Sequence, residues 1–176
     1  VQRRWIEHLD QYSGETAIVA DQTEFDGLYL VEVARGCGRH CRFCMAGYCF
    51  RPPRARSVDA VRQGVANARL QKKKVGLVGA AVSDFPDMEL LCNMLTEESI
   101  GTSVASLRAD STTPELVKVL ADSGHRTITL APEAGSERLR RVINKGISEE
   151  ALLATVAMAL RAGIPNVKLY ILIGLP

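Results

Sequence analysis

The chain has 176 residues, of which 47% are hydrophobic and 24% are charged, and this balance is typical of a globular domain with one sizeable core. The formal net charge of +2 is too small to call for a nucleic-acid partner, although it does not exclude one. No apolar run reaches the roughly 18 residues of a membrane span, and no signal peptide is recognisable. We therefore expect a cytoplasmic protein whose cysteines stay reduced.

The first part of the chain differs in character from the rest. Residues 1–27 are polar and mixed, with Trp5, Ile6 and Leu9 at helical spacing, so we expect a linker with a short helix that leads from an upstream domain. Residues 28–176 are expected to form a single core domain. Both ends of the chain look cut, so we treat it as part of a longer protein.

Short apolar stretches alternate with amphipathic helical stretches beyond residue 27, which predicts a repeated strand-helix unit. The expected strands are Leu28–Ala34, Val75–Ala80, Thr102–Leu107, Thr127–Leu130 and Val167–Ile173. They are apolar on both faces, as in a parallel sheet covered by helices. About five strands are too few to close an eight-stranded barrel. We therefore predict an α/β fold, a partial (β/α) barrel of about five or six parallel strands that is truncated at its carboxyl end, with a doubly wound open sheet as the alternative.

Capping residues mark three of the intervening helices. Thr113, followed by a proline and a glutamate, begins a helix that should end at Ser123-Gly124. Ser136 can cap a helix that ends at Lys145-Gly146, and Ser148 can cap one that ends at Ala162-Gly163. In either architecture the functional residues gather at the carboxyl ends of the strands.

Three cysteines follow the first strand within eight residues: Cys37, Cys41 and Cys44. Thiolates at this spacing can bind three irons of a cubane cluster and leave the fourth iron open to a chelating small molecule. A zinc site completed by His40 or Cys49 is a second interpretation, and a ferredoxin-like cluster with Cys49 as fourth ligand is a third. The zinc site is disfavoured because no second Cys or His pair follows downstream.

With Phe43 before the last cysteine, the motif Cys-x3-Cys-x-aromatic-Cys resembles that of the radical S-adenosylmethionine (radical SAM) superfamily. The resemblance is to the branch with cobalamin-binding radical enzymes, methylthiotransferases and oxygen-independent coproporphyrinogen oxidases. The stretches that carry it are Leu28–Ser57, Ser106–Asp110, Ala131–Gly146 and Lys168–Pro176. It implies that residues 28–176 are a radical SAM core that holds a 4Fe-4S cluster. It also implies that the cluster, once reduced, cleaves S-adenosylmethionine to methionine and a 5′-deoxyadenosyl radical.

The same resemblance assigns contacts with S-adenosylmethionine. Gly79, Ala80 and Ala81 stand where the family often has a Gly-Gly-Glu type segment that meets the amino group, although the acidic member is absent here. Small residues at that point allow close approach of backbone carbonyls, and a close-packed strand end is the alternative. Ser106 and Tyr170 stand where relatives contact the sugar and methionine moieties.

Three charged residues complete the expected site. Arg108 ends the third strand and Glu133 the fourth, also at positions that contact the ligand in relatives. Because charges at the ends of buried strands need partners, we expect these two to pair with each other or with the ligand. Lys145 corresponds to a basic residue that binds the methionine carboxylate, and favourable placement near a helix carboxyl end is its alternative role.

Other conspicuous residues have structural explanations. Cys49 borders the motif but is expected to be a small buried hydrophobe, and Cys92 lies on an apolar helical stripe. Arg51, Arg54 and Arg56 are expected in a solvated loop beside two prolines, with contact to an anionic substrate or adjoining domain as the alternative.

The resemblance also indicates partners. We expect a small-molecule substrate, which the sequence does not identify, a low-potential electron donor of the flavodoxin or ferredoxin type, and cobalamin in an adjoining domain. A tRNA methylthiotransferase-like enzyme is the alternative within the superfamily. A non-catalytic iron–sulfur electron-transfer or metal-binding module is the alternative outside it, and it would use Cys49 as a fourth ligand.

Overall fold

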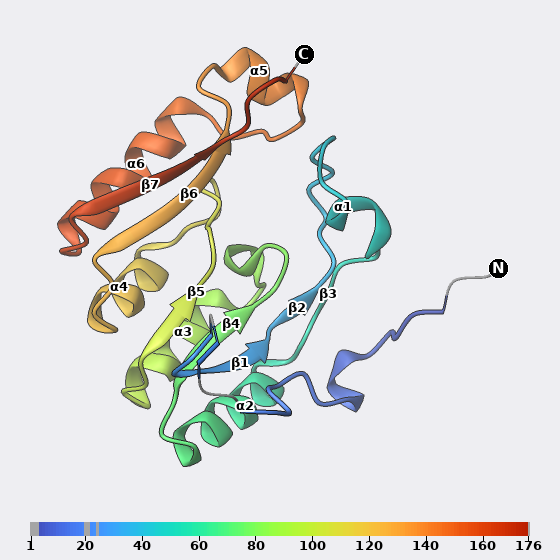
Figure 1. Ribbon diagram of the computed structural model, residues 1–176, viewed down its shortest axis with the longest axis vertical. Coiled ribbons are helices and arrows are strands. Elements are labelled where there is room, and N and C mark those ends of the chain that lie inside the picture. Colours follow the sequence, from blue (N-terminus) through green and yellow to red (C-terminus); the bar gives the residue numbers. More distant parts are fainter. Residues whose placement is uncertain (1–3, 20–21, 24, 176) are drawn as a thin grey trace.

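The computed structural model describes residues 4–19, 22–23 and 25–175 (Figure 1). Its strands are β1 Leu28–Glu32, β2 Ala34–Arg35, β3 Arg54–Ala55, β4 Lys74–Val78, β5 Thr102–Val104, β6 Thr127–Glu133 and β7 Asn166–Ile171. Its helices are α1 Ala46–Cys49, α2 Val58–Leu70, α3 Met88–Glu97, α4 Pro114–Asp122, α5 Glu137–Val142 and α6 Glu149–Arg161, with 3-10 turns η1 Leu9–Gln11 and η2 Val82–Asp84.

Parallel pairing links the strands in the order β1, β4, β5, β6, β7. The sheet β1-β4-β5 is parallel, with Leu28 opposite Lys74, and β6 pairs in parallel with β7. A parallel bridge between Leu107 and Leu130 joins β5 to β6, beyond the end of β5 itself. Consecutive parallel strands with helical crossovers form the predicted partial (β/α) barrel, so the expected α/β fold is confirmed.

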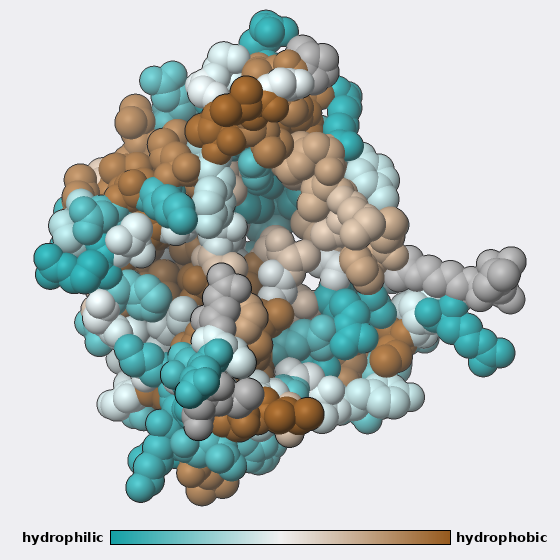
Figure 2. All heavy atoms as spheres, viewed as in Figure 1, coloured by the Kyte–Doolittle hydropathy of each residue, from teal (hydrophilic) through white to brown (hydrophobic). Residues whose placement is uncertain are grey.

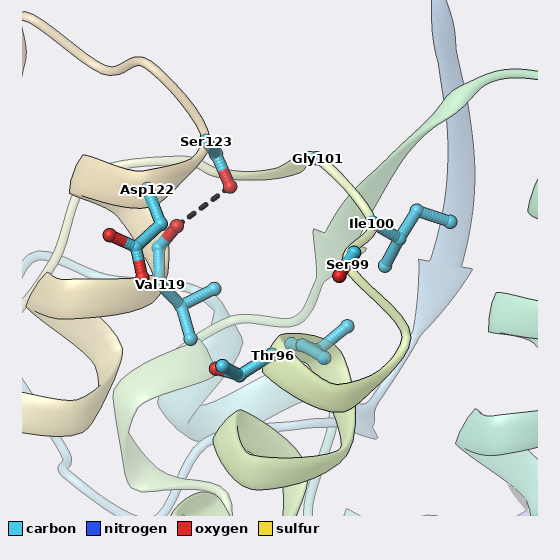
Figure 3. Close-up of a pocket in the computed structure, with 8 residues that line it drawn as sticks. Thr96, Ser99, Ile100, Gly101, Val119, Asp122 and Ser123 are labelled. Carbon is cyan, nitrogen blue, oxygen red and sulfur yellow. Dashed lines mark hydrogen bonds between the residues drawn. The ribbon is translucent and has the colours of Figure 1, made fainter.

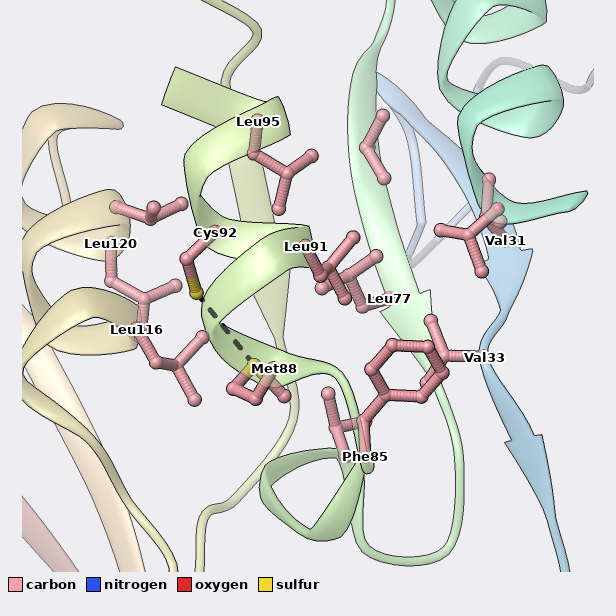
Figure 4. Close-up of a cluster of buried hydrophobic side chains, with 14 of the residues drawn as sticks. Val31, Val33, Leu77, Phe85, Met88, Leu91, Cys92, Leu95, Leu116 and Leu120 are labelled. Carbon is pink, nitrogen blue, oxygen red and sulfur yellow. Dashed lines mark hydrogen bonds between the residues drawn. The ribbon is translucent and has the colours of Figure 1, made fainter. Parts of the chain in front are cut away.

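Apolar side chains hold the helices against the outer side of β1, β4 and β5. Leu91 and Leu95 of α3 are fully buried between Leu77 of β4 and Leu116 of α4 in the cluster shown in Figure 4. Burying each such side chain stabilises the fold by about 1.5–3 kcal/mol. Figure 1 shows α2, α3 and α4 near β1, β4 and β5, and α6 alongside β6 and β7, whereas α1 and its loop project away from these helices. Among the described residues, no helix is long and apolar enough to cross a membrane.

The predicted helix caps are present. The side chains of Thr113, Ser136 and Ser148 each accept a hydrogen bond from the backbone N–H three residues later. The helix that follows Ser136 ends at Val142, however, and not at Lys145 as predicted. Asn144 takes a left-handed conformation with φ of 54°, which turns the chain out of the helix early.

The amino-terminal segment packs on β1. Within residues 4–19 the structure has one short helical turn, the 3-10 turn η1, which includes Leu9 but not Trp5 or Ile6. Glu15 lies opposite Val31 in an antiparallel bridge. Such pairing uses the free edge of β1, which explains why helical spacing in a short polar segment did not decide its structure. Its origin in an upstream domain stays a prediction.

Most of strand β7 is exposed in the described part of the chain. Leu169, Tyr170 and Ile171 are 46–50% exposed, which contradicts the expectation that every strand is buried on both faces. The strand pairs with β6 along one edge. Its sequence is therefore that of a covered strand, whereas its surroundings here are those of an edge strand.

Candidate active site

The three motif cysteines lie in a loop at the carboxyl end of β1. The short antiparallel strands β2 and β3 close the base of this loop, with Arg35 opposite Arg54. Cys37, Cys41 and Cys44 are all free thiols; Cys41 is buried and the other two are partly exposed. Among the described residues no three His, Cys, Asp or Glu side chains form a ready site for a single metal ion.

The donor set nevertheless fits an iron–sulfur cluster in its chemistry. Soft thiolates are the ligands that such clusters use, and each thiolate would bind a different iron. Sulfurs that hold a cubane therefore lie farther apart than the ligands of one ion.

Gly36 shapes the start of the cysteine loop. Its φ is +84°, and a Cβ atom at this position would lie 2.0 Å from the carbonyl oxygen of Phe50. An L-residue would be strained in this conformation and would also clash with backbone. Glycine is thus required directly before Cys37, because the returning chain passes across it.

Backbone contacts tie the loop to the turn that follows α5. The N–H of Arg42 donates to the carbonyl of Ile143 at 2.9 Å. The side-chain amide of Asn144 donates to the carbonyl of His40 at 2.9 Å, from its left-handed position. His40 itself lies edge-on to the ring of Tyr48, with ring centres 6.2 Å apart. The motif is therefore held from two sides, by its own hairpin and by a segment about 100 residues later in the chain.

Arg39, between the first two cysteines, anchors the loop to two further strand ends. Its guanidinium donates to both carboxylate oxygens of Asp84, at 2.7 and 2.6 Å, and to Asp110 at 3.3 Å. The bond to Asp84 raises the pKa of Arg39. Burial alone would raise the pKa of Asp84, but the bonds from Arg39 and Ser111 outweigh it, so the pKa of Asp84 lies below its ordinary value. Both groups are charged over the physiological range.

Arg108 is buried at the centre of the carboxyl edge. It donates to both carboxylate oxygens of Asp110, at 3.0 and 2.7 Å, and to the carbonyl of Lys145 at 2.8 Å. Its Nη1 lies 3.9 Å from the Sγ of Cys41. Arg108 therefore does not pair with Glu133, one of the two partners expected for it, and its carboxylate partner is Asp110, two residues further on. Contact of Arg108 with the ligand stays a prediction.

Glu133 pairs instead with Lys145. Their Oε1 and Nζ atoms are 3.1 Å apart, and the two side chains are only 12% and 8% exposed. Glu133 takes a left-handed conformation with φ of 67°, next to a register shift in β6, and strain of this kind gathers at functional sites. The Lys145 ammonium lies 5.9 Å from the centre of the Phe43 ring. Three predicted site residues thus meet, although Lys145 lies in the turn after α5 and not in the helix.

The remaining predicted contacts are more dispersed. Ala81 lines a hollow of about 300 Å³ together with Cys37, whereas Gly79 lines another hollow on the concave face of β1, β4 and β5. Ala80 and Ser106 are exposed, and Tyr170 is half-exposed with the Lys168 ammonium 5.0 Å from its ring centre. Figure 2 shows that this view of the molecule is hollowed between its upper and lower parts.

The two other cysteines have distinct surroundings. Cys49 is exposed at the end of α1, so the expectation that it is buried is wrong. Cys92 is buried in the core with its Sγ 3.7 Å from the sulfur of Met88, as predicted (Figure 4). Burial raises the pKa of Cys92 to about 12, which keeps it a neutral thiol and removes it from the set of ligands.

Sequence reasoning missed Arg39, Asp84 and Asp110, whose ion pairs join the loops at this edge. The position of Arg39 inside the cysteine motif was a usable signal. Arg56 was expected in a solvated loop but is 5% exposed, because it donates to Glu32 and to two carbonyls of the amino-terminal segment.

A further hollow lies away from the cysteine loop. Figure 3 shows it between the ends of α3 and α4, with Ile100 and Gly101 on one side and Asp122 and Ser123 on the other. These residues precede β5 or end α4, so they lie at the amino end of the strands. The hollow is thus not part of the carboxyl-end site.

Comparison with known proteins identifies the class. Residues 31–176 match the family model described as the radical SAM superfamily, and the chain therefore belongs to this superfamily of enzymes, as the cysteine motif indicated. An uncharacterized protein of Methanocaldococcus jannaschii, MJ0966, is 39% identical over 152 residues, which cover 84% of this chain and 33% of that protein.

A tRNA-2-methylthio-N(6)-dimethylallyladenosine synthase of Chlorobium phaeobacteroides is 27% identical over 148 residues, which cover 78% of this chain and 33% of the synthase. The chain thus spans about a third of the length of these relatives.

Solved structures resemble the fold. The cobalamin-dependent S-adenosylmethionine radical enzyme OxsB, with aqua-cobalamin and S-adenosylmethionine bound, aligns with a TM-score of 0.61 at 19% identity, over 81% of this chain and 23% of OxsB. The radical S-adenosylmethionine methyltransferase TsrM of Kitasatospora setae aligns with a TM-score of 0.62 at 16% identity, over 80% of this chain and 30% of TsrM. At these identities the likeness is one of fold.

Proposed function

We propose that this chain binds a 4Fe-4S cluster through Cys37, Cys41 and Cys44, and binds S-adenosylmethionine at the iron that these three residues leave open. The observation that carries the proposal is the placement of three free thiols in one anchored loop at the carboxyl end of β1, in a member of the radical SAM superfamily. With both groups bound, one electron from the cluster breaks a sulfur–carbon bond of S-adenosylmethionine and yields methionine and a 5′-deoxyadenosyl radical.

The pair formed by Glu133 and Lys145 supports binding of the methionine part. An amino acid zwitterion carries an ammonium and a carboxylate, and the two side chains offer one complementary charge each. We propose that the ligand opens this pair, with its carboxylate accepting from Lys145 and an N–H of its amino group donating to Glu133. Phe43 shields the Lys145 ammonium from one side.

Small and accessible residues are proposed for the rest of the ligand. Gly79, Ala80 and Ala81 allow approach of the ligand to backbone carbonyls after β4. Ser106 and Tyr170 are accessible enough to contact the sugar and the methionine chain.

For the complete reaction we propose a cobalamin-associated enzyme in the cytoplasm that acts on a small molecule and receives electrons from a flavodoxin or ferredoxin type donor. The fold likeness to two S-adenosylmethionine radical enzymes, one of them described as cobalamin-dependent, supports this choice. A tRNA methylthiotransferase-like activity is the second candidate, favoured by the sequence relatives. Bound cobalamin in the purified protein, measured by absorbance, supports the first, whereas a second iron–sulfur cluster without cobalamin supports the other.

The test of radical chemistry is anaerobic reconstitution of the protein, reduction with dithionite, and measurement of 5′-deoxyadenosine by mass spectrometry after addition of S-adenosylmethionine. We expect Cys41→Ala to reduce product to background. The matched variant Cys49→Ala changes an exposed cysteine outside the motif and should retain both cluster and product. A cluster that is lost in Cys49→Ala, with no deoxyadenosine from the wild type, would instead establish an electron-transfer module.

A further inference from the structure

The carboxyl edge contains a chain of charged side chains that leads to one cysteine sulfur. Asp84, Arg39, Asp110 and Arg108 are linked in that order by direct hydrogen bonds. They come from the segment after β4, the cysteine loop and the segment after β5. Each guanidinium binds a carboxylate through two nitrogens, an arrangement that fixes orientation as well as distance.

Asp110 is the shared element of this chain. It accepts from Arg108 on both oxygens and from Arg39 on one of them. Its side chain is 20% exposed, so the three groups lie in a partly desolvated environment where charge-assisted bonds are strong. Movement of the cysteine loop would therefore disturb the orientation of Arg108.

Arg108 has little freedom left after these contacts. Nε and Nη2 bind Asp110, and Nη2 also donates to the carbonyl of Lys145. The remaining nitrogen, Nη1, points to the Sγ of Cys41 at 3.9 Å, and both residues are buried, with 8% and 7% exposed. Asp110 balances the charge of the guanidinium, so the contact that remains is an N–H directed at a buried sulfur with little competition from water.

We propose that Arg108 is a positioning residue that holds an N–H group on the Cys41 sulfur, and that it thereby raises the reduction potential of the cluster proposed above. A hydrogen bond to a ligand sulfur stabilises the added electron, since it compensates part of the negative charge that the reduced cluster places on its ligands. Arg39 and Asp110 act through Arg108 by fixing its orientation. This inference rests on the proposed cluster, and it adds a role for residues that do not bind iron.

The test is a redox titration of the reconstituted protein without S-adenosylmethionine. Electron paramagnetic resonance monitors the reduced cluster and gives its midpoint potential. We expect Arg108→Gln to keep the iron content, because all three cysteines remain, and to shift the potential to a more negative value. Arg108→Lys keeps the positive charge but loses the planar fork that binds Asp110 and directs Nη1 at Cys41, and it should shift the potential in the same direction by a smaller amount. The control Arg69→Gln removes an exposed guanidinium on α2 and should leave the potential unchanged.

The outcomes separate the two proposals. A wild type that forms no cluster would contradict the proposed function, independently of Arg108. A wild type with a cluster and an Arg108→Gln variant of equal potential would overturn the present inference alone. Arg108→Lys decides the matter if Arg108→Gln does not fold, since an unchanged potential in a folded Arg108→Lys variant would also overturn it.

Discussion

The outer side of the sheet and its carboxyl edge are stabilised in opposite ways. On the outer side, α3 and its neighbours bury aliphatic side chains such as Leu91 and Leu95 against β4. At the carboxyl edge, Arg39, Arg108 and Lys145 are each paired with a carboxylate. In the apolar packing any loss of side-chain volume lowers the stability of the fold. The paired charges fix the positions of loops and add little net stability. The comparison teaches that the fold and the site can be perturbed separately.

Leu91→Ala should cause the largest loss of stability. Leu91 is fully buried, and truncation removes its packing and leaves a cavity, so we expect the free energy of unfolding to fall by about 3–5 kcal/mol. Leu90 precedes it in α3 and is 52% exposed, so Leu90→Ala should cost less than about 1 kcal/mol. Urea denaturation of both variants measures the difference, and equal losses would show that the outer side is not the main core.

Gly36→Ala should damage the cysteine loop more than the fold. The added Cβ meets the carbonyl of Phe50 at a positive φ, and we expect a cost of about 1–3 kcal/mol together with loss of most bound iron after reconstitution. Gly38 lies on the other side of Cys37, where a Cβ would be 3.6 Å from the nearest atom, a side-chain carbon of Pro53, so Gly38→Ala is the matched control. Iron content that is equal in the two variants would argue against a fixed loop.

Glu32→Gln should have the smallest effect, of about 1–2 kcal/mol at neutral pH. Burial raises the pKa of Glu32, but hydrogen bonds from Arg35 and Arg56 lower it by more than burial raises it. The pKa of Glu32 is therefore below its ordinary value of 4.5. A carboxyl group whose pKa is lowered in the folded state stabilises the protein at pH values above its ordinary pKa. This stabilisation is lost as the pH falls through the lowered pKa.

The difference between wild type and Glu32→Gln should therefore shrink on acidification below about pH 4.5, as measured by urea denaturation at pH 7 and at successively lower pH. Asp59→Asn, which breaks an exposed pair with Arg62, should change little at any pH. A gap between wild type and Glu32→Gln that widens in acid would contradict the pairing with Arg56.

Periodicity and capping residues predicted the strand-helix repeat and the starts of the helices after Thr113, Ser136 and Ser148, because these depend on local sequence. The cysteine spacing likewise led to the correct superfamily. The ion pairs between charged side chains were harder to predict from the sequence. Arg108 took Asp110 and not Glu133, because such pairing depends on distances between loops that are remote in sequence.

The burial of a side chain could not be predicted from the sequence where a distant segment determines it. Arg56 is buried because the amino-terminal segment folds over it, and Cys49 is exposed because α1 projects from the sheet. Neither fact follows from the residues next to them. The register shift that puts Glu133 in a left-handed conformation was equally invisible, since it arises from the pairing of β6 with β7.

The most direct test of the central claim is the electron paramagnetic resonance spectrum of the reduced, reconstituted protein with and without S-adenosylmethionine. Three cysteine ligands leave one iron open, so we predict a 4Fe-4S signal whose shape changes when S-adenosylmethionine binds, in wild type and in Cys49→Ala alike. A signal that ignores S-adenosylmethionine and disappears in Cys49→Ala would show a fourth protein ligand and contradict the claim.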